Sequence, residues 1–167
     1  MYSQCNQHQM INNNDILRRL RYAFDFSDSK MIELFGLADL EVTRAQISDW
    51  LKKDNDPENQ PITDEQLATF LNGFISDKRG KKDGPQPVPE KFLNNNIILR
   101  KLKIALQLRD DDLVDIIQLV GFSVSKHEIN AIFRNPKQKQ YRPCKDQFLR
   151  YFLKGLQLKY RGDEESN

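Results

Sequence analysis

The stretch from Lys126 to Arg161 has the composition of a surface that binds phosphate groups. Ten Lys or Arg residues stand there against two acidic residues, with six Phe or Tyr residues among them. Interleaved cations and aromatic rings can hold phosphates and stack on bases. The alternative is a solvated basic face whose aromatic residues belong to the core. The best candidate surface for an anionic partner is the polar loop in this stretch, with Arg134, Lys137, Lys139, Tyr141, Arg142 and Lys145.

Metal chemistry has little support in this sequence. Cys5 and His8 have a C-x-x-H spacing that could supply half of a metal site. The other half would need Cys144 and His127, which lie far from the first pair and have no paired spacing. We therefore expect no metal ion and no cofactor. Two cysteines are too few for a disulfide framework, which favours the reducing cytoplasm.

Catalytic motifs are absent from the sequence, which has no Gly-rich nucleotide loop, no H-E-x-x-H and no G-x-S-x-G. A histidine-based triad would have to use His127, whose position near the start of a predicted helix indicates a solvent-facing side chain. The run Asp110-Asp111-Asp112 falls in the first turn of another predicted helix, where the macrodipole favours acids. We expect a non-enzymatic binding module.

These residues belong to a chain in which one unit occurs twice. A shift of 82 residues aligns 12–80 with 94–162 without a gap, and 20 of the 69 pairs are identical. Asn12-Asn13-Asn14 meets Asn94-Asn95-Asn96 in this alignment. Chance would give about four identities at ordinary composition. Duplication explains the pattern, and it leaves open whether the copies form two domains or share one core.

Each copy shows helical periodicity, which predicts an all-α fold with four helices per copy. The first helix has an apolar face from Ile16 to Phe24, with Asn13 or Asn14 as the expected N-cap. The third helix starts with a capping box in both copies, formed by Thr43-Arg44-Ala45-Gln46 and by Ser125-Lys126-His127-Glu128. The fourth helix should begin near Thr63, and its copy should carry Pro143 in the first turn.

The remaining segments are short. We expect a disordered N-terminal segment at 1–11, a proline-rich linker at 81–93 and an acidic tail at 163–167 around the repeats 12–80 and 94–162. Three prolines between Pro85 and Pro89 exclude a helix from the linker. No apolar run approaches the ~20 residues that span a bilayer.

Charge is divided unequally between the copies. Residues 12–80 carry 9 basic and 13 acidic residues, a net charge of −4, whereas residues 94–162 carry 14 and 6, a net charge of +8. The polar loop before the fourth helix is acidic in one copy (54–60) and basic in the other (136–142). This asymmetry predicts a nucleic-acid surface on the second copy. The alternative is a protein-interaction adaptor or homodimer in which the acidic lobe of one chain meets the basic lobe of another.

The second and third helices of each copy also suggest a DNA-binding arrangement. The stretch V-T-R-A-Q-I-S-D-W at 42–50 resembles the recognition helix of lambda-repressor-like helix-turn-helix proteins. That resemblance implies that Arg44, Ala45 and Asp49 would face the major groove, with Lys126, His127 and Ala131 in the second copy. The alternative is a helical hairpin built for packing.

Several longer stretches resemble the YehS-like family of small bacterial proteins, whose members carry the unit twice. They are Asn13-Asn14-Asp15-Ile16-Leu17-Arg18, Leu99-Arg100-Lys101-Leu102-Lys103, Ser125-Lys126-His127-Glu128 and Cys144-Lys145-Asp146-Gln147-Phe148-Leu149-Arg150. The resemblance covers roughly residues 10–162. It implies a cytoplasmic bacterial protein, and it brings no activity, cofactor or catalytic residue with it.

Overall fold

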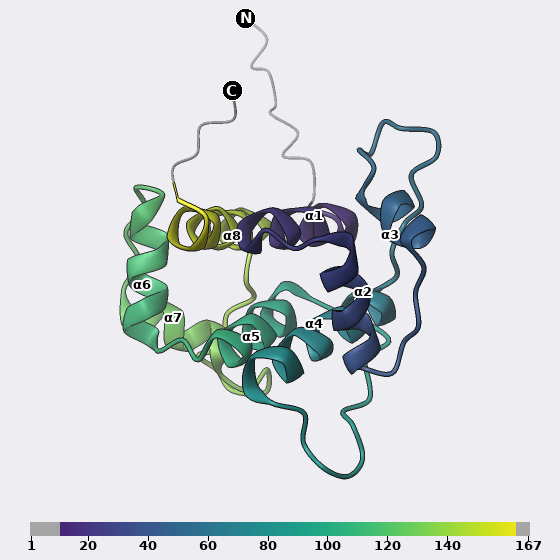
Figure 1. The fold of residues 1–167 in the computed structure, drawn as a ribbon. Helices are drawn as coiled ribbons and strands as arrows, with labels where there is room; N and C mark the ends of the chain where they lie inside the picture. The colour runs from purple at the N-terminus through teal and green to yellow at the C-terminus, as the bar shows by residue number, and fades with distance from the viewer. Residues whose placement is uncertain (1–10, 163–167) are drawn as a thin grey trace, which may run out of the picture.

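A computed structural model describes residues 11–162, and all regular structure in that range is helical (Figure 1). The first copy contains α1 (Asn13–Phe24), α2 (Asp28–Leu37), α3 (Arg44–Leu51) and α4 (Asp64–Arg79). The second contains α5 (Asn95–Leu106), α6 (Asp110–Leu119), α7 (Lys126–Phe133) and α8 (Asp146–Tyr160). Each helix of the second copy begins 82 residues after its counterpart, as the internal alignment predicts. The all-α prediction is confirmed.

The helix starts follow from local capping chemistry. Thr43 with Gln46 and Ser125 with Glu128 form the two predicted capping boxes. The predicted N-cap of the first helix is wrong by at least one residue. The cap is Asn12, whose side chain accepts a hydrogen bond from the Asp15 backbone N–H, and Asn94 does the same for α5. The next two asparagines are thereby left for tertiary contacts.

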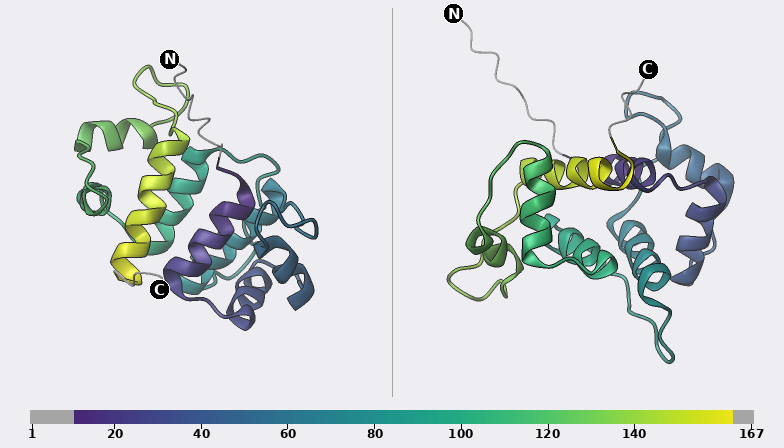
Figure 2. Two further views of the ribbon diagram at one scale, coloured as in Figure 1. Left: turned by 90° about the horizontal axis from the view of Figure 1, so that it is seen from above. Right: turned by 60° about the vertical axis from the view of Figure 1, so that its left-hand side comes forward.

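The two copies share one core. The most extensive helix contacts include two that join the copies, α1 with α8 and α4 with α5 (Figure 2). By comparison α1 touches α4 only lightly, and α5 touches α8 only lightly, although each of these pairs belongs to one copy. The buried apolar side chains of both copies form a single cluster. Helices α2 and α3 lie at one end of the molecule, and α6 and α7 lie at the other (Figure 1).

Two glycines allow the fourth helix of each copy to approach the second helix closely. A Cβ atom added at Gly73 would lie 1.7 Å from the backbone oxygen of Leu34. A Cβ added at Gly155 would lie 2.4 Å from the backbone oxygen of Ile116. Both distances are far below van der Waals contact, so the α2–α4 and α6–α8 packing requires glycine at these positions.

The last helix, α8, begins later than the sequence predicts. Pro143 was expected in the first turn of α8, but the helix begins three residues later, at Asp146, because Lys145 still has extended backbone angles.

Residues 1–10 and 163–167, which include Cys5, His8 and the acidic tail, lie outside the described residues, whereas Ile11 is described and packs against the core. Within the described range, each helix lacks the length and apolar character that crossing a membrane would require.

Candidate functional site

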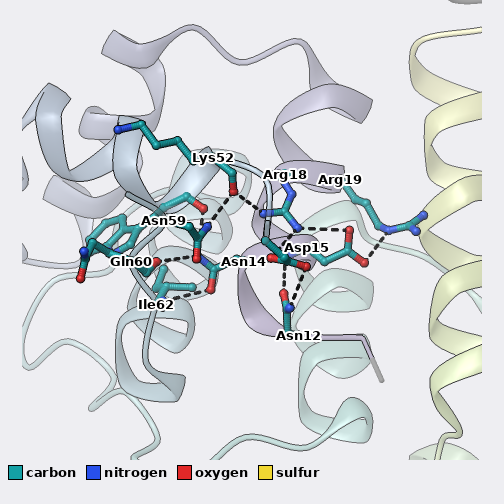
Figure 3. A network of polar contacts seen from close by, with 11 residues as sticks. Asn12, Asn14, Asp15, Arg18, Arg19, Lys52, Asn59, Gln60 and Ile62 are labelled. Carbon is teal, nitrogen blue, oxygen red and sulfur yellow. Dashed lines mark hydrogen bonds and ion pairs between the residues drawn. The ribbon is translucent and has the colours of Figure 1, made fainter. Parts of the chain in front are cut away.

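A buried asparagine ties the first helix of each copy to the segment that follows the third helix. The side-chain amide of Asn14 donates to the backbone oxygens of Trp50 (2.9 Å) and Gln60 (2.7 Å). Its oxygen accepts a hydrogen bond from the backbone N–H of Ile62 at 3.1 Å (Figure 3). All of the hydrogen-bonding capacity of one buried amide except one lone pair is therefore used to fix the backbone of a loop.

The second copy repeats this device at its basic segment. Asn96 donates to the backbone oxygens of Ile132 and Arg142, each at 3.0 Å, and accepts from the backbone N–H of Cys144 at 2.8 Å. The four positions are those of the first copy plus 82. Asn96 is only 8% exposed, so water has little access to its side chain. Loss of these hydrogen bonds would leave buried polar groups unpaired, which costs free energy. The backbone at Arg142 is thus held rigidly although it belongs to a loop.

We use the name basic segment for residues 134–145, which connect α7 and α8. Lys137, Lys139, Arg142 and Lys145 are exposed there. No carboxylate among residues 11–162 lies within ion-pair distance of any of these four cations. The equivalent segment of the first copy differs, because there Asp54 pairs with Arg18 at 3.2 Å and Glu58 with Lys52 at 2.9 Å. The basic segment therefore presents charge that no carboxylate of the described residues neutralises.

The other two predicted residues of this segment have structural contacts. Arg134 donates a short hydrogen bond to the side chain of Gln140, which closes the turn between them. Tyr141 is half-buried, and its backbone N–H donates to the oxygen of Gln138 at 3.1 Å. These residues shape the loop that carries the four exposed cations.

The predicted residues on the third helices do not join this group. Lys126 forms an ion pair with Asp111 at 2.6 Å, and this hydrogen-bonded partner raises the pKa of Lys126. His127 is exposed beside it on α7. Arg44 lies on α3 at the opposite end of the molecule and donates to Ser29 at 2.8 Å (Figure 1).

The expected groove-facing orientation of α7 is wrong at one position. Ala131 is 4% exposed and packs into the core, so it cannot meet a base edge. In the first copy Asp49 is ion-paired with Lys52 at 2.9 Å. The third helices therefore present fewer side chains that could contact base edges than the sequence pattern implies.

A hollow of about 440 Å³ adjoins the basic segment, between α7 and the start of α8. Arg142 and Lys145 contribute to its wall. Its lining is mostly apolar and includes Phe122, Val124, Ile132, Phe148 and Tyr151. The rings of Phe122 and Tyr151 lie 5.0 Å apart at an angle of 30°. Ligand sites in proteins commonly combine such an apolar surface with a few polar groups at the edge.

The copies differ at several of the residues that line this hollow. Position 132 is Ile where the first copy has Trp50, a buried ring that packs on Phe35 at 5.4 Å. Position 144 is Cys where the first copy has Ile62. The second copy has thus lost side-chain volume below the surface. At the mouth it has gained three rings, at 122, 148 and 151, in place of Leu, Gln and Thr.

The start of α8 has also lost its cap. In the first copy Thr63 and Gln66 form a capping box at α4. At the equivalent positions the second copy has Lys145, whose side chain makes no capping hydrogen bond, and Phe148. The first turn of α8 already contains the carboxylate of Asp146, so it is the cation of Lys145, and not the helix N-terminus, that favours a negative group at this edge of the hollow.

The hollow was not predicted from the sequence. Phe148 reads as a core residue because it is spaced four positions from Phe152, but only Phe152 is fully buried. The available signal was the comparison of the copies position by position, in which Trp50 aligns with Ile132. Cys144 lies at the floor of the hollow, where burial raises the pKa of its thiol to about 12. It is therefore neutral at physiological pH and is not a reactive nucleophile.

Comparison with known proteins places the chain in a family. The model of a family described as "Protein of unknown function (DUF1456)" matches residues 13–80 and again residues 95–162. The chain belongs to this family. It is 44% identical over 144 residues to the uncharacterized protein YehS of Escherichia coli (strain K12), covering 86% of this chain and 92% of that protein. No solved structure matches the chain. The two matches coincide with the two copies defined by the internal alignment.

Proposed function

We propose that the protein binds nucleic acid through the basic segment of its second copy. The observation that supports this proposal is the group of four exposed cations, Lys137, Lys139, Arg142 and Lys145, that have no carboxylate partner among residues 11–162. Phosphate backbones bind such groups by releasing condensed counterions, which needs no sequence-specific contact. The rigid backbone at Arg142 lowers the ordering cost of the contact.

We propose that binding uses the basic segment rather than α7. A helix-turn-helix mode, as in the lambda-repressor-like proteins, would need α7 to present base-reading side chains. Lys126 at its first position is paired with Asp111, and Ala131 is buried. His127 is then the main exposed candidate on that helix. We therefore favour phosphate contacts from the basic segment over groove reading by α7.

The proposal is tested by the salt dependence of binding to fluorescently labelled oligonucleotides. Four phosphate contacts on a single strand predict a slope of log K against log salt of about −3. Substitution of Lys137 and Lys139 by Gln should reduce that slope by about 1.4. A matched control replaces two exposed lysines outside the segment, Lys53 and Lys82, and should leave the slope unchanged. Absence of binding at low salt to both single-stranded and duplex oligonucleotides would refute the proposal.

A second candidate function is a protein-interaction adaptor or a homodimer that uses oppositely charged lobes. Its support is the acidic character of residues 54–60 against the basic residues 136–142. The internal pairing of Asp54 and Glu58 weakens the acidic surface, and we rank this candidate second for that reason. Light scattering at two salt concentrations tests it. A salt-sensitive dimer would support it, and a monomer at both concentrations would contradict the homodimer.

A further inference from the structure

The hollow beside α8 has the features of a site for one flat aromatic group next to a negative charge. Its volume of about 440 Å³ lies within the range of small-ligand sites. Its lining is mostly apolar and aromatic, with the cations Arg142 and Lys145 and one carboxylate, Glu128, which accepts a hydrogen bond from the Ser125 backbone N–H in the capping box of α7. A nucleotide combines these two features, because its base has a π-face and its phosphate is anionic.

We propose that this hollow receives one unstacked base of a single-stranded nucleic acid, while Arg142 and Lys145 contact the adjacent phosphates. This inference rests on the proposed function and adds to it the strand type that the protein prefers. A base in a duplex stays stacked between its neighbours and cannot enter a hollow without being extruded. A single strand presents its bases at lower cost, and an aromatic side chain can stack on any of them.

The comparison of the copies supports a built site rather than a packing defect. If the hollow came from loss of core volume alone, polar residues would be expected at its mouth. The exposed Phe122 and the partly buried Phe148 and Tyr151 stand there instead, where the first copy has Leu40, Gln66 and Thr69. One exposed ring, Phe122, and two partly buried rings therefore lie beside cations that have no carboxylate partner among residues 11–162, and single-strand-binding surfaces combine aromatic rings with cations in this way.

The experiment compares a labelled 12-nucleotide DNA strand with the same strand made abasic at every position. Both strands carry the same phosphates. We expect the ordinary strand to bind the wild-type protein about tenfold more tightly than the abasic strand, since one base stacks. Ile132→Trp restores the residue of the first copy and should fill the hollow. It should abolish the difference between the strands and leave abasic binding and its salt slope unchanged.

Two further variants keep the test decisive. Tyr151→Thr removes a ring from the mouth of the hollow without adding volume to the core, so it serves if Ile132→Trp does not fold. Leu119→Ala removes an exposed apolar side chain of α6 that does not line the hollow and is the matched control. We expect Tyr151→Thr to weaken binding to the ordinary strand several-fold and Leu119→Ala to have no effect.

The outcomes separate this inference from the proposed function. Equal affinity for the ordinary and abasic strands, or full affinity in both hollow variants, would overturn the base site while phosphate binding persists. Binding of adenosine monophosphate as tight as that of the 12-nucleotide strand would instead assign the hollow to a free nucleotide. Failure of both strands to bind at low salt would overturn the proposed function and this inference together.

Discussion

Replacement of the buried asparagines by aspartate should produce a stability loss that grows with pH. Asn14→Asp leaves one oxygen able to accept from the Ile62 N–H, but the other oxygen replaces a donor that lies 2.9 Å and 2.7 Å from two backbone oxygens. Ionised, that oxygen would face two acceptors in a buried position. Asn96→Asp creates the same conflict with the oxygens of Ile132 and Arg142.

The magnitude follows from the two protonation states. A protonated carboxyl can still donate to one backbone oxygen, so at low pH the loss is one hydrogen bond and one unpaired acceptor, about 1–3 kcal/mol. Burial and the two oxygens should raise the pKa of the new carboxyl by about three units above its usual 3.9, which adds about 4 kcal/mol at pH 7. The total of about 6 kcal/mol is a large fraction of the stability of an ordinary domain.

The pH dependence has a definite sign. The folded-state pKa of the carboxyl lies above its unfolded value, so the folded variant binds more protons between the two. The extra loss is absent below about pH 4, grows as the pH rises, and levels off above the folded pKa of about 7. Urea unfolding followed by circular dichroism at pH 4 and pH 7, with the wild type measured in parallel, gives the difference.

Asn130→Asp is the control for added charge, because Asn130 is exposed on α7. We expect it to change stability by less than about 0.5 kcal/mol at either pH. A loss that is the same at pH 4 and pH 7 in the two buried variants would refute the account of the amide bonds. The two buried variants also distinguish an effect on stability from an effect on the binding site, since of the two asparagines only Asn96 binds the backbone of Arg142. At a pH where both variants are folded, Asn96→Asp should weaken nucleic-acid binding and Asn14→Asp should not.

Three further predictions concern packing, contact between the copies and thiol reactivity. Gly73→Ala should lower the free energy of unfolding, measured in urea, by about 3 kcal/mol or more, and Gly155→Ala should lower it somewhat less. The added Cβ would lie 1.7 Å from a backbone oxygen in the first case and 2.4 Å in the second. Stability equal to that of the wild type would contradict the packing. Arg161→Ala should lower the melting temperature, since this side chain bonds across the copies to the end of α1, whereas Arg79→Ala, at the equivalent exposed position, should have little effect. In a variant whose other cysteine is replaced by serine, Cys144 of the native protein should react with a thiol reagent at least about 100-fold more slowly than Cys144 of the protein unfolded in urea. The reason is that burial keeps the thiol neutral. Fast labelling of the native protein would refute this.

The features that the sequence predicted are those decided over a few residues. The capping boxes at Thr43 and Ser125 depend on side chains three positions apart, and periodicity locates the buried face of each helix. The N-cap at Asn12 was missed because three asparagines in a row offer three equivalent caps. Only the tertiary contacts of Asn14, with backbone atoms 36 to 48 residues away, decide among them.

The pairing of the copies could not be read from the same pattern. An apolar stripe on α1 predicts that the helix is buried, but it does not say whether α4 or α8 covers it. The structure shows α8. The hollow could not be predicted for the same reason. The smaller side chain at Ile132 leaves space only in combination with its neighbours from α8 and the 120–125 turn, which the sequence does not identify. The exposure of the cations in the basic segment was predictable from their place in a polar loop. Their lack of carboxylate partners among residues 11–162 was not, since the equivalent loop of the first copy pairs Asp54 with Arg18 and Glu58 with Lys52.

The differences between the copies favour a binding role for the second. A duplicated unit under equal structural demand on both copies should keep its stabilising devices in both, as it keeps the buried asparagines and the close-approach glycines. The second copy instead lacks the α4-type capping box, worth about 1 kcal/mol, and the buried ring of Trp50. Other losses lie away from the hollow, since Arg109 at α6 lacks the side-chain cap that Ser27 gives α2, and Ile117 replaces the buried ring of Phe35. At the hollow, however, a lost cap and a lost ring adjoin cations that have no carboxylate partner among residues 11–162. This combination supports the proposed ligand site beside Arg142 and Lys145.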